Sequence, residues 1–162
     1  MLSYVNLKYK PKHTEVLVEY YVDPAKGYTL DYCAEQIAAE SSIGTWVTIS
    51  TMNKRIANKL KPHVYYINKK TKIIKIAYPQ ALFEKGNMPQ ILSSIAGNIF
   101  GMKMLRNLRL EDIEFPKGLI DSFKGPRYGI AGIRQLTRVK DRPLIGTIVK
   151  PKVGLNEKQH AK

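Results

Sequence analysis

Two lysines at the end of an apolar segment are the side chains best suited to chemistry in this 162-residue chain. The segment "TIVKPK" ends at Lys152, and an extended backbone would place Lys150 and Lys152 on the same face. An amine in a pocket of low dielectric constant has a lowered pKa and can act as a base, while a solvated amine can hold a phosphate. A basic tail at a solvated end of the chain explains the same residues equally well.

A second candidate is the segment "ESSIGTW", which runs from Glu40 to Trp46. The hydroxyl group of Thr45 and the indole N–H of Trp46 are donors that suit a phosphate oxygen, and Glu40 can pair with a lysine. The alternative is purely structural: the serines and the glycine form a turn, and the tryptophan packs in the core. Composition alone favours this alternative.

A third candidate is Asn98, which stands between glycines in "GNIFG" at the end of a predicted helix. Asparagine at such a place is usually a capping or turn residue, and a ligand contact is the less common role. Metal-binding patterns are missing, because the three histidines lie far apart and Cys33 has no cysteine partner. We therefore expect no metal site made by this chain alone.

The charge balance points to an anionic partner. The chain has 27 basic and 13 acidic residues, a formal net charge of +14. Such an excess suits nucleic acid or a phosphorylated metabolite. Eight lysines and arginines, with no acidic residue, fall between Lys54 and Lys75. A solvated hairpin with lysines on its edge is the favoured interpretation of this basic run, and nucleic-acid binding is the alternative.

The composition is that of an ordinary globular domain, with 44% hydrophobic and 25% charged residues. One cysteine allows no intrachain disulfide and favours a reducing compartment. No apolar stretch approaches the roughly 18 residues of a membrane span, and no secretory signal is visible. We expect a cytoplasmic protein without a membrane partner.

The predicted elements give an α+β fold. Strands are expected at 14–22, 45–50, 63–68, 71–79 and 105–116, and helices at 29–41, with Thr29 as N-cap, and 88–101. Four of these five strands and the two helices follow the order strand, helix, strand, strand, helix, strand, which predicts a ferredoxin-like sandwich (βαββαβ) with 63–68 and 71–79 forming a hairpin. A short helix at 118–123, a linker at 124–132 and a short helical turn at 133–143 follow. We place a domain boundary near Gly125, giving domains 1–124 and 125–162.

Several motifs together resemble one family. "ESSIGTW", "AYPQALFEKGN", "SSIAGNIFG", "LRLEDIEFP", "FKGPRYGI" and "RPLIGTIVKPKVGL" occur in this order and at similar spacing in the large subunit of ribulose-bisphosphate carboxylase (Rubisco). The resemblance covers the chain from about Tyr20 to Leu155. The segment between Trp46 and Tyr65 is more similar to the archaeal and Rubisco-like branches than to the plant enzymes.

This resemblance implies an N-terminal α+β domain followed by the first strand of an incomplete (β/α)8 barrel, whose other strands are missing. It implies a head-to-tail dimer in which the domain covers the barrel of the partner subunit. By similarity, Thr45 and Trp46 hold a substrate phosphate, and Asn98 contacts the sugar near a magnesium ion. Glu40 then pairs with a lysine of a mobile barrel loop. Lys150 is the implied base that forms the enediolate, and Lys152 assists substrate binding and protonation.

Three hypotheses follow for the function. The first is the N-terminal part of a carboxylase (a lyase) that adds CO2 to ribulose 1,5-bisphosphate and is inactive without the barrel. This inactivity is expected because the family's carbamylated lysine and acidic magnesium ligands have no counterpart in the chain. The second is a domain of a Rubisco-like enolase or isomerase acting on another phosphorylated sugar. The third is a free-standing basic domain that binds RNA or a protein.

Overall fold

The structure, a computed structural model, describes residues 3–44, 54–146, 156 and 158. The chain divides into two compact units, Met1–Lys124 and Gly125–Lys162. We call them the first and the second unit. Each is described by itself below.

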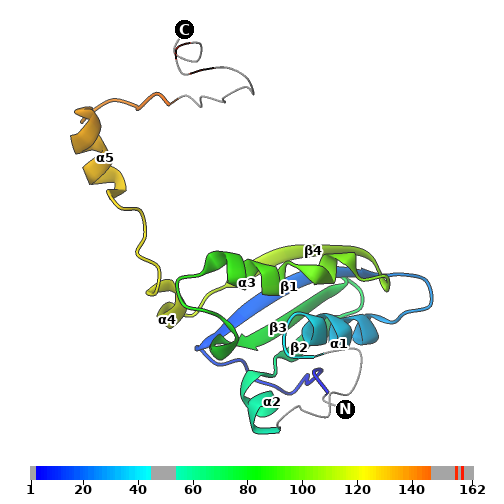
Figure 1. Ribbon diagram of the computed structural model, residues 1–162. Coiled ribbons are helices and arrows are strands. Elements are labelled where there is room, and N and C mark those ends of the chain that lie inside the picture. The colour runs from blue at the N-terminus through cyan, green and yellow to red at the C-terminus, as the bar shows by residue number, and fades with distance from the viewer. Residues whose placement is uncertain (1–2, 45–53, 147–155, 157, 159–162) are drawn as a thin grey trace. The chain divides into compact units, whose positions relative to one another are not determined.

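The first unit is built on a four-stranded antiparallel sheet (Figure 1). Its strands are β1 (Glu15–Pro24), β2 (His63–Asn68), β3 (Ile73–Pro79) and β4 (Leu105–Glu114). The strand order is β2-β3-β1-β4, so the first strand along the chain lies inside the sheet. Every second side chain from Val16 to Val22 of β1 is apolar and buried, so one face of this strand is covered by the core.

The other regular elements among the described residues are helices. They are α1 (Leu30–Glu40), α2 (Lys54–Leu60), α3 (Met88–Ile95), α4 (Lys117–Ile120) and α5 (Gly129–Thr137), with the 3-10 helices η1 (Gln80–Leu82) and η2 (Asn98–Gly101). The hydroxyl group of Thr29 accepts a hydrogen bond from the N–H of Tyr32 at 3.2 Å, so the predicted N-cap of α1 is confirmed.

The core of the first unit lies between one face of the sheet and the helices α1 and α3 (Figure 1). The sheet contributes residues of even number from β1 and β3, which include Val18, Tyr20 and Ile76. The helices contribute Ile37 from α1 and Ile91 from α3, both without exposed surface. Residues of one face repeat every second position in a strand and every three to four positions in a helix, which is the pattern found here.

The mixed α/β class and the antiparallel sheet confirm the coarse fold prediction, and the hairpin of β2 and β3 forms as expected. The helix predicted at 88–101 is wrong in length, because α3 ends at Ile95 and a separate 3-10 helix follows. The segment predicted as a linker contains the start of α5. The strand predicted at 45–50 lies outside the described residues. The predicted barrel strand is the apolar run 145–149. Its first two residues, Ile145 and Gly146, are in no strand, and residues 147–149 lie outside the described residues.

Candidate functional site

Glu40 is the last residue of α1, and local hydrogen bonds end the helix immediately after it. The Ser41 hydroxyl group donates to the carbonyl oxygen of Ile37 at 2.6 Å. The Ser42 hydroxyl group donates to the carbonyl oxygen of Ala38, also at 2.6 Å. Serine hydroxyl groups that bond back in this way compete with further helix formation. The helix therefore stops with the Glu40 side chain at its end.

Gly44 completes this turn by close packing. A Cβ atom at Gly44 would lie 2.6 Å from the Cβ atom of Ala39, a distance that side chains do not tolerate. Its N–H also donates to the Ala39 carbonyl oxygen at 3.0 Å. The glycine in the "ESSIGTW" motif is thus required by the close approach of the chain to the end of α1.

Asn98 begins η2, three residues after the end of α3. A Cβ atom at Gly97 would lie 2.0 Å from the carbonyl oxygen of Ser93, so only glycine fits between the two helices. This close contact ends α3 and turns the chain toward the position of Asn98. The Asn98 side chain is exposed.

Glu40 and Asn98 line the same hollow, of about 400 Å³. The other lining residues are Tyr28, Gly101, Met102, Lys103 and Met104. The Met104 carbonyl oxygen is fixed by the N–H of Ala25 at 2.9 Å and by the thiol of Cys33 at 3.5 Å. Within the described parts of the chain, the Glu40 carboxylate and the Asn98 side-chain amide have no hydrogen-bond or ion-pair partner.

This arrangement combines a carboxylate, an amide and the amine of Lys103 on one open surface. The amide can donate to and accept from a ligand hydroxyl group, and the carboxylate can pair with an incoming cation. The sequence singled out Glu40 and Asn98 but missed Tyr28 and Lys103. Lys103 follows the "GNIFG" motif by two residues, so its proximity to Asn98 along the chain was the available signal.

Four predicted site residues, Thr45, Trp46, Lys150 and Lys152, lie outside the described residues. Their roles stay predictions. Cys33 is buried on the apolar side of α1, and burial raises the pKa of its thiol to about 11, so the thiol is an unreactive part of the core.

The basic run between Lys54 and Lys75 carries less free charge than its sequence suggests. Three of its lysines form ion pairs: Lys69 with Asp31 at 2.8 Å, Lys72 with Asp23 at 2.7 Å and Lys75 with Glu19 at 2.7 Å. The amine of Lys61 donates to the carbonyl oxygen of Ser3 at 2.7 Å. The run thus lies partly on a hairpin, as predicted, but at least four of its eight lysines and arginines are engaged within the first unit.

The described residues contain no cluster of three or more histidine, cysteine, aspartate or glutamate side chains. No helix in these same parts of the chain is long and apolar enough to cross a bilayer.

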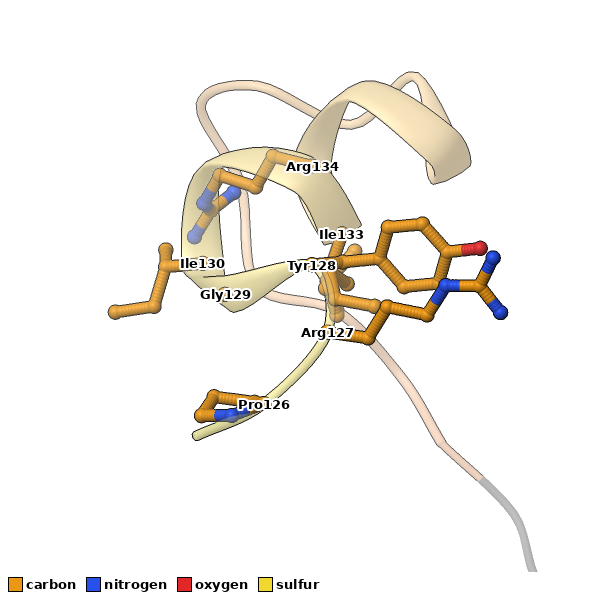
Figure 2. Close-up of a pocket in the computed structure, with 8 residues that line it drawn as sticks. Pro126, Arg127, Tyr128, Gly129, Ile130, Ile133 and Arg134 are labelled. Carbon is orange, nitrogen blue, oxygen red and sulfur yellow. The ribbon is translucent and has the colours of Figure 1, made fainter. Parts of the chain in front are cut away.

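The second unit has a hollow of its own, of about 430 Å³ (Figure 2). It is lined by Pro126, Arg127, Tyr128, Gly129, Ile130, Ile133, Arg134 and Leu144. The Arg127 guanidinium lies 5.4 Å from the centroid of the Tyr128 ring, while Ile130 points away from both. None of the predicted site residues lines this hollow.

Residues 3–119 match the model of the ribulose bisphosphate carboxylase large chain, N-terminal domain. The chain belongs to this family. The ribulose bisphosphate carboxylase of Methanosarcina mazei is 49% identical over 98% of this chain, and that of Methanocaldococcus jannaschii is 48% identical over 99%.

Solved Rubisco structures have the same fold. The octameric Rubisco of Pyrococcus horikoshii matches with a TM-score of 0.81 and 45% identity over 98% of this chain. A dimeric archaeal Rubisco from Hyperthermus butylicus matches with a TM-score of 0.80 and 42% identity over 94%. The chain spans only 37% of the length of the Methanosarcina mazei and Pyrococcus horikoshii proteins. The archaeal branch of the family, suggested by the segment after Trp46, is the one to which these relatives belong.

Proposed function

We propose that this chain acts as the N-terminal part of a ribulose-bisphosphate carboxylase, which adds CO2 to ribulose 1,5-bisphosphate. The observation that carries the proposal is the meeting of Glu40 and Asn98 in one hollow. The two residues come from separate elements, and near each of them a glycine, Gly44 or Gly97, allows a close approach of the chain that a Cβ atom would obstruct. Membership in the Rubisco large-chain family supports a role for that hollow in a carboxylase active site.

In this proposal the hollow is one half of a shared site. Asn98 would contact the substrate sugar, and Glu40 would pair with a lysine on a barrel loop. Thr45 and Trp46 would hold a substrate phosphate through a hydroxyl group and an indole N–H. Lys150 would remove the proton that gives the enediolate, and Lys152 would assist binding and protonation.

The remaining half would come from the barrel of a partner subunit in a head-to-tail dimer. The open surface of the hollow suits such a neighbour, as does the Glu40 carboxylate, which has no partner among the described residues. Relatives with solved structures are a dimer and an octamer, so assembly is common among them. We also assign the strand order β2-β3-β1-β4 to a ferredoxin-like sandwich. The apolar run 145–149 would form the first barrel strand only when the rest of a barrel is present.

Magnesium, the ion that the family implies, has no carboxylate set among the described residues. We assign its ligands to the barrel and expect the chain alone to be inactive. A bound magnesium ion would stabilise the negative charge of the enediolate.

A free-standing RNA-binding domain is a weaker alternative, because internal ion pairs occupy three lysines of the basic run. A Rubisco-like enolase or isomerase would use the same hollow, and the substrate separates it from the carboxylase. Random RNA offered at several salt concentrations tests the first alternative, since phosphate contacts make affinity strongly salt-dependent.

The deciding experiment is a fixation assay with labelled bicarbonate, ribulose bisphosphate and magnesium. The chain is assayed alone and mixed with a separately produced barrel from an archaeal relative. We expect activity only in the mixture. The Asn98→Ala and Glu40→Gln variants should each lower kcat/KM at least about tenfold, because each removes a contact within the shared site.

The matched controls are Asn107→Ala and Glu111→Gln, which remove the same groups from exposed positions of β4. These variants should keep the activity of the unmodified chain. Absence of fixation in a mixture that is shown to associate would contradict the carboxylase proposal. Turnover of another phosphorylated sugar by that mixture would favour the Rubisco-like alternative.

A further inference from the structure

Buried hydroxyl groups hold two helix ends near the hollow. One is the end of α1, which carries Glu40, and the other is the end of α3, three residues before Asn98. The hydroxyl oxygen of Ser41, the residue after Glu40, lies 2.8 Å from that of Tyr78 in β3. At the other end, the Tyr20 hydroxyl group of β1 donates to the carbonyl oxygen of Ile95 at 2.6 Å. Ile95 is the last residue of α3 and precedes Asn98 by three positions.

The protons of this chain of groups have a defined direction. Ser41 donates its proton to the Ile37 carbonyl oxygen at 2.6 Å, so it accepts from Tyr78 rather than donating to it. Tyr20 donates its own proton to Ile95. Every hydroxyl proton thus has an acceptor, and the carbonyl group at the end of α3, which lacks an intrahelical partner, is satisfied by a side chain of the sheet.

The two tyrosines belong to one core cluster and come from paired strands. Neither side chain has exposed surface. Burial raises the pKa of Tyr78 to about 12 and that of Tyr20 well above its usual value. Both therefore stay protonated at neutral pH and remain hydrogen-bond donors.

The sheet makes this link rigid. Tyr20 pairs with Ile74 and Tyr78 pairs with Val16 in the antiparallel ladder of β1 and β3. Both tyrosines project from the covered face, one toward the end of α3 and the other toward the end of α1. The hydroxyl groups are thus carried by adjacent strands, whose spacing is fixed by backbone hydrogen bonds.

We infer that Tyr20 and Tyr78 are positioning residues, which hold the ends of α1 and α3 at the separation that Glu40 and Asn98 need. They touch neither the hollow nor, in the proposed site, the substrate. The inference rests on the proposed function, because the separation matters only if both residues serve one site. Its physical part, a coupling between the two helix ends, can be measured without activity.

The first test follows amide hydrogen exchange in the 162-residue chain. The N–H of Phe100 in η2 donates to the carbonyl oxygen of Gly97 at 3.2 Å, which makes it a probe of the Asn98 segment. Tyr78→Phe removes the hydroxyl group at the far, α1 end of the link. We expect it to speed exchange at Phe100 at least about fivefold, because the loosened tyrosine pair no longer fixes η2.

Two control variants separate positioning from general loosening. Tyr21→Phe makes the same chemical change at the neighbouring residue on the other face of β1. Ile76→Val weakens the core beside the network without removing a hydroxyl group. For each control variant, any change in the amide exchange rate at Phe100 should be no larger than the change expected from its effect on the free energy of global unfolding. Exchange at Phe100 that responds to Tyr20→Phe but not to Tyr78→Phe would overturn the inference, since the two ends would then be independent.

The second test uses the chain mixed with the barrel. Tyr20→Phe and Tyr78→Phe should each lower kcat/KM about tenfold, and Ile76→Val should leave it unchanged. Coupled exchange together with unchanged kcat/KM in an active mixture would overturn the positioning role. An inactive mixture of unmodified chains would instead count against the proposed function, and coupled exchange at Phe100 would still support the link.

Discussion

The helices α3 and α5 have similar amphipathic sequences but very different surroundings. In the first unit, α3 places Ile91 and Ile95 in the core with no exposed surface. In the second unit, α5 buries none of its residues, and Ile130 is 81% exposed. An apolar stripe therefore does not guarantee burial, because burial also needs a neighbouring face to receive it. The first unit supplies that face with its sheet.

The largest expected effect comes from shortening one isoleucine in each helix. Ile91→Ala in α3 should lower the free energy of unfolding by about 2–5 kcal/mol, because it leaves a cavity in a closed core. Ile130→Ala in α5 should change it by less than about 0.5 kcal/mol. Urea unfolding followed by circular dichroism measures both. Equal losses would mean that α5 is covered in solution, and the comparison would fail.

The next effect separates the polar contacts of the two units. Asp23 of β1 accepts hydrogen bonds from Lys72 at 2.7 Å and from Arg106 at 2.5 Å, which tie β1 to the β2–β3 hairpin and to β4. In the second unit, the Arg134 guanidinium donates to three carbonyl oxygens that follow α5. Asp23→Asn should shift the main unfolding transition, while Arg134→Ala should only speed local amide exchange at 139–142.

The contribution of Asp23 should also depend on pH. Hydrogen bonds from Lys72 and then from Arg106 hold the pKa of this carboxyl group below its usual value. A lowered folded-state pKa stabilises the fold above the unfolded-state pKa of about 4, and this gain is lost as the pH falls through the lower folded-state value. The difference in urea midpoint between the unmodified chain and Asp23→Asn should therefore shrink below about pH 4. A constant difference across that range would contradict this assignment.

The sequence predicts the local structure of the first unit well because its signals are local. The alternation in β1 and the Thr29 cap of α1 involve residues within a few positions of each other. The end of α3 was missed because it depends on a steric contact between Gly97 and Ser93, which periodicity does not reveal. The length of α5 was missed because its glycines are typical of a linker.

Residues alone predict less of the site than of the fold. Glu40 and Asn98 are separated along the chain, and only the packing of α1 beside η2 brings them into one hollow. Residue types alone favoured structural roles for the motifs that contain Glu40 and Asn98. The site was assigned by the family resemblance. The tyrosine link was also missed, because Tyr20 and Tyr78 have the spacing of ordinary core residues in their strands. Hydrogen bonds across 75 residues, as between Tyr20 and Ile95, leave no local signal.

The smallest effect concerns the charges of the two units. The first unit contains 18 basic and 11 acidic residues, and the second contains nine basic and two acidic residues, so half of the net charge lies in the shorter unit.

The substitution Lys69→Ala removes an exposed ion pair of the first unit. The side chain of Lys69 is 72% exposed, and that of its partner Asp31 is 45% exposed. We expect the free energy of unfolding to change by less than about 0.5 kcal/mol, because water screens exposed ion pairs. The matched variant Lys70→Ala, at the adjacent exposed position, should give the same result within error at 0.15 M salt. A larger loss for Lys69→Ala alone, reduced by added salt, would mean that ion pairs stabilise the first unit as its core does, and would remove the distinction between its interior and its basic run.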